Sequence, residues 1–176
     1  MICDTNMTKD ALESLIEYAH LESKKIAIIG VSGPKMKHVP DDLSHVDVLI
    51  CNLDETQSYF NTQITDLKSL IQLWIDKGIK NIVMTHGKNG SIYYDGKEIG
   101  FQKAILIDQE KIKDVTGAGD AFSSAVIHGL IHGDTLKQSV KYGAVSSGLT
   151  IQSEFSVNPK LSINLIKKEI KKYENV

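Results

Sequence analysis

Apolar runs that alternate with amphipathic segments constrain the fold of this chain more than any other feature. The runs at residues 25–30, 46–50 and 81–84 are bounded by charged or turn-forming residues, as expected for strands buried on both faces of a sheet. Between them, apolar residues recur every three or four positions, which is the spacing of one buried helix face. This alternation predicts βαβ units with parallel strands, and therefore an α/β fold. With 176 residues, 41% of them hydrophobic, the chain is long enough for one domain with a substantial core.

Caps, turn residues and periodicity predict the remaining elements. Residues 1–6 read as the end of a strand that runs into a loop, and Thr8 is placed to cap the helix that follows. The buried face of that helix is predicted to hold Leu12, Leu15, Ile16 and Ala19. The other predicted elements are a short helical stretch opening at 41–43, a helix ending at Phe60, a helix from Ile64 to Lys77, a hairpin around Asp95-Gly96, a strand over 104–107, and helices over 121–131, 136–149 and 159–173.

Charge and hydropathy exclude several classes of partner. The net charge of −2 gives no global attraction for nucleic acid or for an anionic membrane. No apolar run approaches the roughly 20 residues of a membrane helix, and the N-terminus lacks a basic-then-apolar signal pattern, so we expect a cytoplasmic protein. Cys3 and Cys51 are far apart and lack the spacing of metal ligands, so we expect two buried thiols and no zinc site.

A glycine-rich turn at Lys113–Asp120 stands directly before a helix-patterned segment. Three small residues, Gly117, Ala118 and Gly119, let backbone N–H groups converge at a helix start, where the dipole favours a phosphate. A carboxylate beside such an anion site repels the ligand unless it has a task, such as accepting the proton of an attacking hydroxyl. Asp120 is such a carboxylate. The alternative is an ordinary glycine-rich helix start, in which Asp120 merely complements the helix dipole.

The segment Asp114-Val115-Thr116-Gly117-Ala118-Gly119-Asp120 resembles the C-terminal signature of the ribokinase-like (PfkB-type) carbohydrate and nucleoside kinases. The resemblance implies that Asp120 is the catalytic base and that the amides of Gly117, Ala118 and Gly119 form the anion hole. It also implies a potassium ion near Asp114 and Thr116, which match positions around a monovalent cation in many members.

Two further motifs resemble the same family. Asn52 and Glu55 match its Asn-x-x-Glu motif, which helps to organise phosphates and the magnesium shell, although Cys51 replaces the usual proline. On the residues alone, Asn52 or Asp54 could equally cap a helix, with Glu55 solvated. The nucleotide-binding Thr-x-Gly-x-x-Gly loop is matched by Thr85, Gly87 and Gly90.

The helix predicted from about residue 136 carries a run of small residues at 143–148. The resemblance places the adenine ring near this helix, with Ala144 and Ser147 as its neighbours. Close packing against another helix is the alternative use of such a surface.

The resemblance implies a three-layer α/β sandwich with a mostly parallel sheet, and an enzyme that uses ATP and Mg²⁺ to phosphorylate a primary hydroxyl. Residues 3–8, 31–35 and 153–159 are most similar to pseudouridine kinases, although Gly30 stands where that subgroup has an aspartate. The small-molecule acceptor would then be pseudouridine and the product pseudouridine 5′-phosphate. The alternatives are a kinase for another nucleoside or sugar, of the ribokinase or fructokinase type, and a non-catalytic nucleotide-binding module. A carboxylate at position 120 favours the enzyme.

Members of this family are typically longer, and their N-terminal half supplies the lid and most sugar-binding residues. We therefore expect residues 1–176 to form a single C-terminal nucleotide-binding and catalytic part that lacks the lid and is inactive alone. We also expect it to self-associate as dimers or larger species, through exposed apolar surface or a sheet edge.

Overall fold

The computed structural model describes residues 1–174, with side chains to residue 172, and it divides into two compact units. The first unit comprises residues 1–87 and 91–101, and the second comprises 88–90 and the chain from 102 onward. In the described part of the chain, no helix is long and apolar enough to span a membrane.

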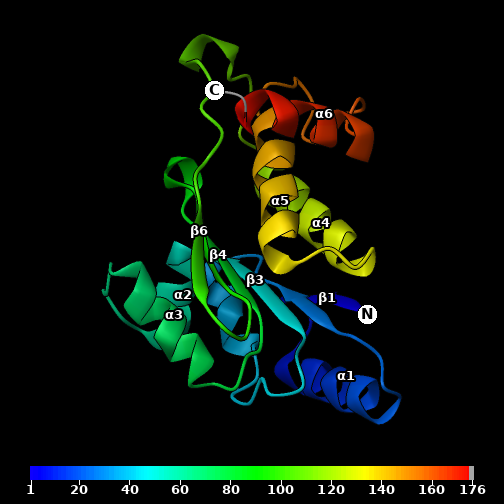
Figure 1. Cartoon of the computed structure of the whole chain (residues 1–176). Coiled ribbons are helices and arrows are strands. Elements are labelled where there is room, and N and C mark those ends of the chain that lie inside the picture. Colours follow the sequence, from blue (N-terminus) through cyan, green and yellow to red (C-terminus); the bar gives the residue numbers. More distant parts are fainter. Residues whose placement is uncertain (175–176) are drawn as a thin grey trace. The chain divides into compact units, whose positions relative to one another are not determined.

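A six-stranded sheet with the order β1-β2-β3-β4-β5-β6 dominates the first unit (Figure 1). Strands β1 to β4 are parallel to one another, and β5 runs antiparallel to β4. A turn at Gly96, which has a φ of +85°, joins β5 to β6. The α/β class and the mostly parallel sheet predicted from the sequence are confirmed. The strands are β1 (Ile2–Asp4), β2 (Ala27–Ile29), β3 (Val48–Asn52), β4 (Ile82–Thr85), β5 (Ser91–Tyr94) and β6 (Ile99–Gln102).

Each α-helix of the first unit begins at a residue whose side chain accepts a hydrogen bond from the first turn. Thr8 caps α1 (Lys9–Leu21), Asn52 caps α2 (Leu53–Phe60) and Asp66 caps α3 (Leu67–Ile75). The β2–β3 connection also contains a 3₁₀ helix, η1 (Gly33–His38). Ile64, predicted to lie within a helix, is exposed ahead of α3.

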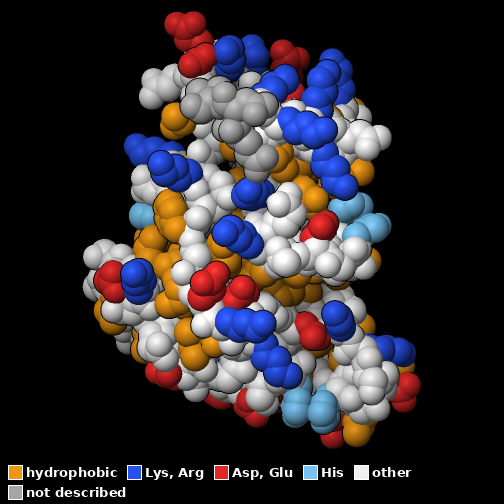
Figure 2. All heavy atoms as spheres, in the orientation of Figure 1, with side chains coloured by type: hydrophobic (Ala, Val, Ile, Leu, Met, Phe, Trp, Pro, Cys, Tyr) orange, Lys and Arg blue, Asp and Glu red, His pale blue; other side chains and the backbone are white. Residues whose placement is uncertain are grey.

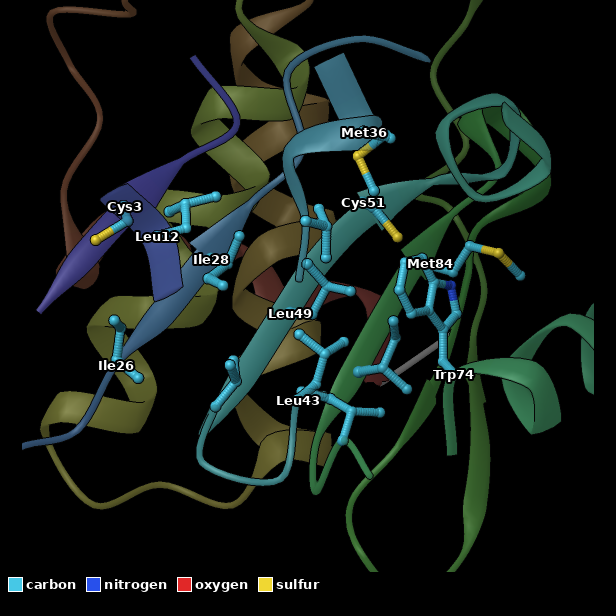
Figure 3. Close-up of a cluster of buried hydrophobic side chains, with 14 of the residues drawn as sticks. Cys3, Leu12, Ile26, Ile28, Met36, Leu43, Leu49, Cys51, Trp74 and Met84 are labelled. Atoms are coloured by element: carbon cyan, nitrogen blue, oxygen red, sulfur yellow. The ribbon is translucent and has the colours of Figure 1, made fainter. Parts of the chain in front are cut away.

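The core of this unit lies between the sheet and its helices. Alternate residues of the central strands, Ile28, Leu49 and Met84 among them, join Leu12 of α1 and Trp74 of α3 in one buried cluster (Figure 3). Both cysteines are buried free thiols, Cys3 on β1 and Cys51 on β3, as predicted.

Three α-helices form the second unit: α4 (Ala118–Ile131), α5 (Leu136–Thr150) and α6 (Ile163–Glu174), with a 3₁₀ turn, η3 (Gln109–Lys111), before them. Helices α4 and α5 pack closely because Gly143 has no side chain. A Cβ at that position would lie 2.9 Å from Val126 Cγ2 and 3.0 Å from the Phe122 ring. Close helix packing is therefore one use of the small residues at 143–148.

Two predicted elements are absent because local hydrogen bonds or missing partners override the pattern. Asp42 Oδ1 accepts from the amide of Ser44 at 2.9 Å and the Val46 amide donates to the Leu43 carbonyl, so residues 41–46 form turns and not a helix. The run at 104–107 pairs with no strand in the described chain. Its Ile105 contacts the position of Gly148, while Leu106 is 91% exposed.

The last helix starts four residues later than Pro159 suggested. The Asn158 side chain accepts from the Lys160 amide at 3.0 Å, and its amide group donates to the Leu149 carbonyl. This holds residues 158–160 in a turn, and Ser162 accepts from the Leu165 amide at 3.3 Å at the start of α6.

Candidate active site

The start of α4 is shaped by one obligatory glycine. Gly117 precedes the helix with a φ of +79°, in the left-handed region that disfavours side chains. A Cβ at Gly117 would also collide with the carbonyl of Ser156, from the loop after α5. The first turn of α4 has the usual helical hydrogen bond, since the Ala121 amide donates to the Gly117 carbonyl at 2.9 Å.

Open backbone amides surround this helix start. In the described part of the chain, the N–H groups of Gly117, Gly119 and Asp120 have no acceptor, whereas the Ala118 amide donates to the Val115 carbonyl at 3.2 Å. A Cβ built on Gly119 meets nothing within 4 Å, and both Gly119 and Asp120 are exposed. The helix dipole adds to the unpaired amides, so this surface suits an anion that can approach the backbone closely.

Asp120 lies in the first turn of α4, one residue beyond the glycine pair. Its carboxylate is therefore exposed beside the open amides rather than buried among side chains. A carboxylate in this place is accessible to a hydroxyl group that approaches an anion held by the same helix start. This geometry permits general-base chemistry there.

Asp114 and Thr116 are brought together just before the glycine turn. Asp114 Oδ1 accepts from the Thr116 amide at 2.9 Å and from its hydroxyl at 2.8 Å. These two bonds, the backbone one first, lower the pKa of Asp114, so its carboxylate is held in the charged form. The amide of Lys113 also donates to the Ile151 carbonyl at 2.8 Å. Charged and carbonyl oxygens of this kind suit a hard cation, and the potassium role of Asp114 and Thr116 stays a prediction.

In the first unit, the structure brings Asn52, Glu55 and Thr85 to the carboxyl ends of neighbouring strands. Asn52 and Thr85 are paired in register on β3 and β4. The Glu55 amide donates to Asn52 Oδ1 at 2.8 Å, and the Asn52 amide donates to Glu55 Oε2 at 2.8 Å. This capping box leaves the side-chain NH₂ of Asn52 without an acceptor among the described residues.

Glu55 is only 4% exposed, so the alternative of a solvated side chain is wrong, although Asn52 does cap the helix. Burial raises the pKa of Glu55, and the hydrogen bond from the Asn52 amide partly offsets this. A Cβ at Gly30 would lie 2.5 Å from Glu55 Oε2 and 3.2 Å from Cys51 Cβ. The carboxyl group of Glu55 thus fills the space that a side chain at position 30 needs.

The loop after β4 has two glycines with positive φ, Gly87 at +52° and Gly90 at +95°. A Cβ at Gly90 would collide with the Gln102 carbonyl and lie 2.9 Å from the amide nitrogen of Ala104, so only glycine fits.

On α5, Ala144 is buried and Ser147 half-buried. The nucleotide roles predicted for Thr85, Gly87, Gly90, Ala144 and Ser147 stay predictions.

Sequence reasoning missed two threonine hydroxyls. Thr5 Oγ1 accepts from the Val31 amide at 3.1 Å, and Lys35 Nζ donates to Asn6, so the stretches 3–8 and 31–35 meet. The only sequence signal for this hydrogen bond of Thr5 is that a polar residue stands at the end of a strand. The hydroxyl oxygen of Thr56 likewise accepts a hydrogen bond from the indole N–H of Trp74 at 3.2 Å.

The Cys51 thiol does not belong to the candidate chemistry. It lies 3.2 Å from the hydroxyl oxygen of Thr56, and burial raises the pKa of Cys51 to about 12, so the reactive thiolate is scarce near neutral pH. Cysteine at the position of the usual proline therefore packs in the core.

The residues present suit a magnesium ion carried by phosphates rather than one caged by protein. In the described chain, no three His, Cys, Asp or Glu side chains gather as a metal site. Mg²⁺ in phosphoryl-transfer sites is bound mainly by substrate phosphates and water, with one or two carboxylates. The buried Glu55 and the free amide group of Asn52 fit such an indirect role.

Small-molecule kinases typically combine an α/β fold and a mostly parallel sheet with a glycine turn at the start of a helix. The turn leaves backbone amides unpaired, and a carboxylate lies beside them. The model of the pfkB family of carbohydrate kinases matches residues 2–162, and the chain belongs to this family.

Individual proteins that are similar to this chain support its membership of the family. An adenosine kinase from Saccharomyces cerevisiae is 28% identical over 158 residues, which cover 83% of this chain and 46% of the relative. An ATP-dependent 6-phosphofructokinase from Thermoanaerobacterium thermosaccharolyticum is 34% identical over 113 residues, or 63% of this chain and 33% of the relative. The solved structure of a carbohydrate kinase from Agrobacterium tumefaciens is 27% identical, with a TM-score of 0.80 over 97% of this chain and 53% of that one. The chain therefore spans about half the length, or less, of these proteins.

Proposed function

We propose that the protein is an ATP-dependent kinase that phosphorylates a primary hydroxyl of a small nucleoside or sugar, with pseudouridine as the acceptor. The observation that carries this proposal is the start of α4. There, the unpaired amides of Gly117, Gly119 and Asp120 and the exposed Asp120 carboxylate occupy the same helical turn. An anion site and a base in one turn are what phosphoryl transfer to a hydroxyl needs.

Each group has a defined task in this reaction. The Asp120 carboxylate accepts the proton of the acceptor hydroxyl, a step that contributes about 10²–10⁴-fold to the rate. The amides of Gly117 and Gly119 donate hydrogen bonds to the transferring phosphoryl group, while Ala118 holds the turn through its bond to Val115. Bound ATP supplies the γ-phosphoryl group, and Mg²⁺ neutralises the charge of its phosphates.

We assign nucleotide binding to the residues that match the motifs of the family. Asn52 donates its free amide group to phosphate, with Glu55 fixing its orientation through the capping box. Thr85, Gly87 and Gly90 contact the nucleotide, and Ala144 and Ser147 lie near the adenine ring. Asp114 and Thr116 hold a potassium ion that stiffens the turn before the anion hole.

The choice of pseudouridine rests on sequence similarity, because residues 3–8, 31–35 and 153–159 resemble those of pseudouridine kinases. In the structure, residues 3–8 and 31–35 are joined by hydrogen bonds of Thr5 and Asn6. Residues 153–159 include Ser156, whose carbonyl packs on Gly117 at the glycine turn. The second candidate is another nucleoside or sugar, since the relatives include an adenosine kinase and 5-dehydro-2-deoxygluconokinases.

Nucleotide binding and turnover are tested separately, because the chain spans about half the length of its relatives. Calorimetric titration with a non-hydrolysable ATP analogue, with and without Mg²⁺, should show magnesium-dependent binding that Asp120→Asn preserves. Radiolabelled phosphate transfer to pseudouridine, adenosine, ribose and fructose should identify the acceptor. Any turnover should fall by about 10²-fold or more in Asp120→Asn.

Asp10→Asn is the matched control, because Asp10 lies in the first turn of α1, where no glycine turn precedes the helix. It should leave both measurements unchanged. Unaltered transfer by Asp120→Asn would show that Asp120 is not the base. Absence of nucleotide binding by the wild-type chain would contradict the assignment of the anion site. We expect these 176 residues to bind nucleotide but to transfer phosphate poorly alone.

A further inference from the structure

The last turns of α4 carry two histidines that the proposed kinase chemistry does not use. His128 and His132 are one helical turn apart, with ring centroids 4.2 Å apart and ring planes inclined by 30°. Figure 2 shows histidine side chains, in pale blue, at the surface beside the region that α4 occupies in Figure 1. His132 is exposed and His128 is half-buried. Side chains at this spacing project from the same helix face.

The structure fixes which nitrogen of His132 is available. Its Nδ1 lies 2.8 Å from the backbone carbonyl oxygen of His128. A carbonyl oxygen can only accept a hydrogen bond, so Nδ1 carries the proton and Nε2 of the neutral ring presents its lone pair outward. Metal-binding histidines are usually oriented in this way, with one ring nitrogen donating to a carbonyl and the other binding the ion.

The second ring is also accessible to a ligand. Neither ring nitrogen of His128 has a hydrogen-bond partner among the described residues. His128 lines an open groove of about 260 Å³ in the second unit, together with Ser124, Ser162 and Ile163. A hydrated ion can therefore approach the pair from solvent without displacing an existing bond.

We propose that His128 and His132 bind one divalent transition-metal ion, of which Zn²⁺ is the test case. His132 contributes Nε2 and His128 contributes one ring nitrogen. Imidazole is a ligand for Zn²⁺, Cu²⁺ and Ni²⁺ and a poor one for Mg²⁺ and Ca²⁺, so the site discriminates against the ion that the kinase reaction uses. Because no third His, Cys, Asp or Glu joins the pair in the described chain, water completes the coordination.

The site is separate from the proposed anion hole and does not depend on it. His128 follows Asp120 by eight residues, or about 12 Å along a helix axis. The negative end of the α4 dipole favours a cation at this position. A bound ion links two successive turns and should therefore raise the thermal stability of the protein, by an amount that grows with the logarithm of the free ion concentration above its Kd.

Zinc titration of the untagged chain by calorimetry at pH 7.5, without nucleotide, tests the proposal. The wild-type protein should bind one Zn²⁺ in a step that excess Mg²⁺ does not abolish. His128→Gln and His132→Gln should each weaken this step at least about tenfold.

The double variant His20→Gln/His45→Gln is the matched control. It removes the other histidine pair, whose rings stack at 3.6 Å in the first unit, and it should bind Zn²⁺ at the α4 site like the wild type. Circular dichroism of metal-free proteins checks that each variant folds, and copper paramagnetic resonance should report two nitrogen ligands in the wild type and one in each α4 variant. Zinc binding that survives loss of His128 and His132, or that disappears only in the His20/His45 variant, would overturn the proposal.

Discussion

Glu55 is the residue that most clearly links the fold to the candidate chemistry. Its carboxyl group caps α2 and packs against the backbone of Gly30. The resemblance to pseudouridine kinases implies an aspartate where this chain has Gly30, and the structure supplies a physical reason for the glycine. A second side chain would have to occupy the volume that Glu55 already fills.

A double-mutant cycle tests this competition for space. Gly30→Ala should destabilise the wild type by about 1–2 kcal/mol, because the new Cβ displaces Glu55 and breaks the cap. In a Glu55→Ala background the same substitution should cost less than half as much. Urea unfolding of the four proteins measures both values. Equal costs in the two backgrounds would mean that Cys51, and not Glu55, excludes a side chain from position 30.

The pH dependence of stability should also report on Glu55. Its pKa is raised in the folded state, so the folded protein holds this proton more tightly than the unfolded chain does. The stabilisation that this proton provides is complete below the unfolded-state pKa and is lost as pH rises through the folded-state pKa. Glu55→Gln keeps an acceptor for the Asn52 amide but carries no charge.

The free energy of unfolding of Glu55→Gln should therefore increase relative to the wild type as pH rises from about 4 to 7.5. Denaturant midpoints across that range measure the difference. Glu17→Gln, which removes an exposed carboxylate from α1, controls for the loss of a charge alone. A wild type that gains stability over Glu55→Gln with rising pH would contradict the burial argument.

Among the elements, the start of α4 offers the sharpest prediction, because two glycines two residues apart have opposite requirements. Gly117→Ala should destabilise the protein by about 1–3 kcal/mol, since it has a positive φ and its Cβ would collide with the Ser156 carbonyl. Gly119→Ala should be neutral or stabilising by up to about 1 kcal/mol, because it lies inside the helix and its Cβ faces open space. Thermal unfolding of both variants measures this, and shifts of the same size and direction would refute it.

The elements that the sequence predicted well are those defined by local chemistry. Thr8 caps α1 as expected, Asn52 caps α2 as one of the alternatives allowed, and Gly96 turns the hairpin. The strand expected at residues 104–107 failed for lack of a distant partner. Residues 104–107 have the composition of a strand, but a strand needs a neighbour to pair with, and no short-range pattern reveals that none is adjacent.

The candidate site was predictable to a similar extent. The Asp114–Asp120 motif predicted which residues stand at the start of α4, and Asn52 was one of two candidates for the cap of α2. The part of Glu55 in the capping box was not predicted. The burial of Glu55 did not follow, because it depends on Gly30, which lies on a different strand connection. The bond of Ala118 to Val115 was also hidden, since it depends on turn geometry that composition does not determine.

For the whole molecule, the arrangement of the sheet makes self-association the main prediction. Strand β1 is at one end of the strand order, and its main chain bonds to β2 alone in the described structure. Ile2 on this strand is 58% exposed. An apolar edge strand with unpaired backbone groups is a template for pairing with another chain. We therefore expect a concentration-dependent dimer formed through β1.

Sedimentation velocity on Ile2→Lys tests this expectation. A lysine at a sheet edge opposes strand pairing, so the variant should remain monomeric at concentrations where the wild type dimerises. Leu21→Lys is the matched control, because Leu21 is even more exposed, at 73%, but ends α1 and lies on no strand. Phe101→Lys probes the opposite edge, on β6. If only Phe101→Lys dissociates the dimer, pairing uses β6, and a wild type that stays monomeric at the highest concentration would rule out association through either edge.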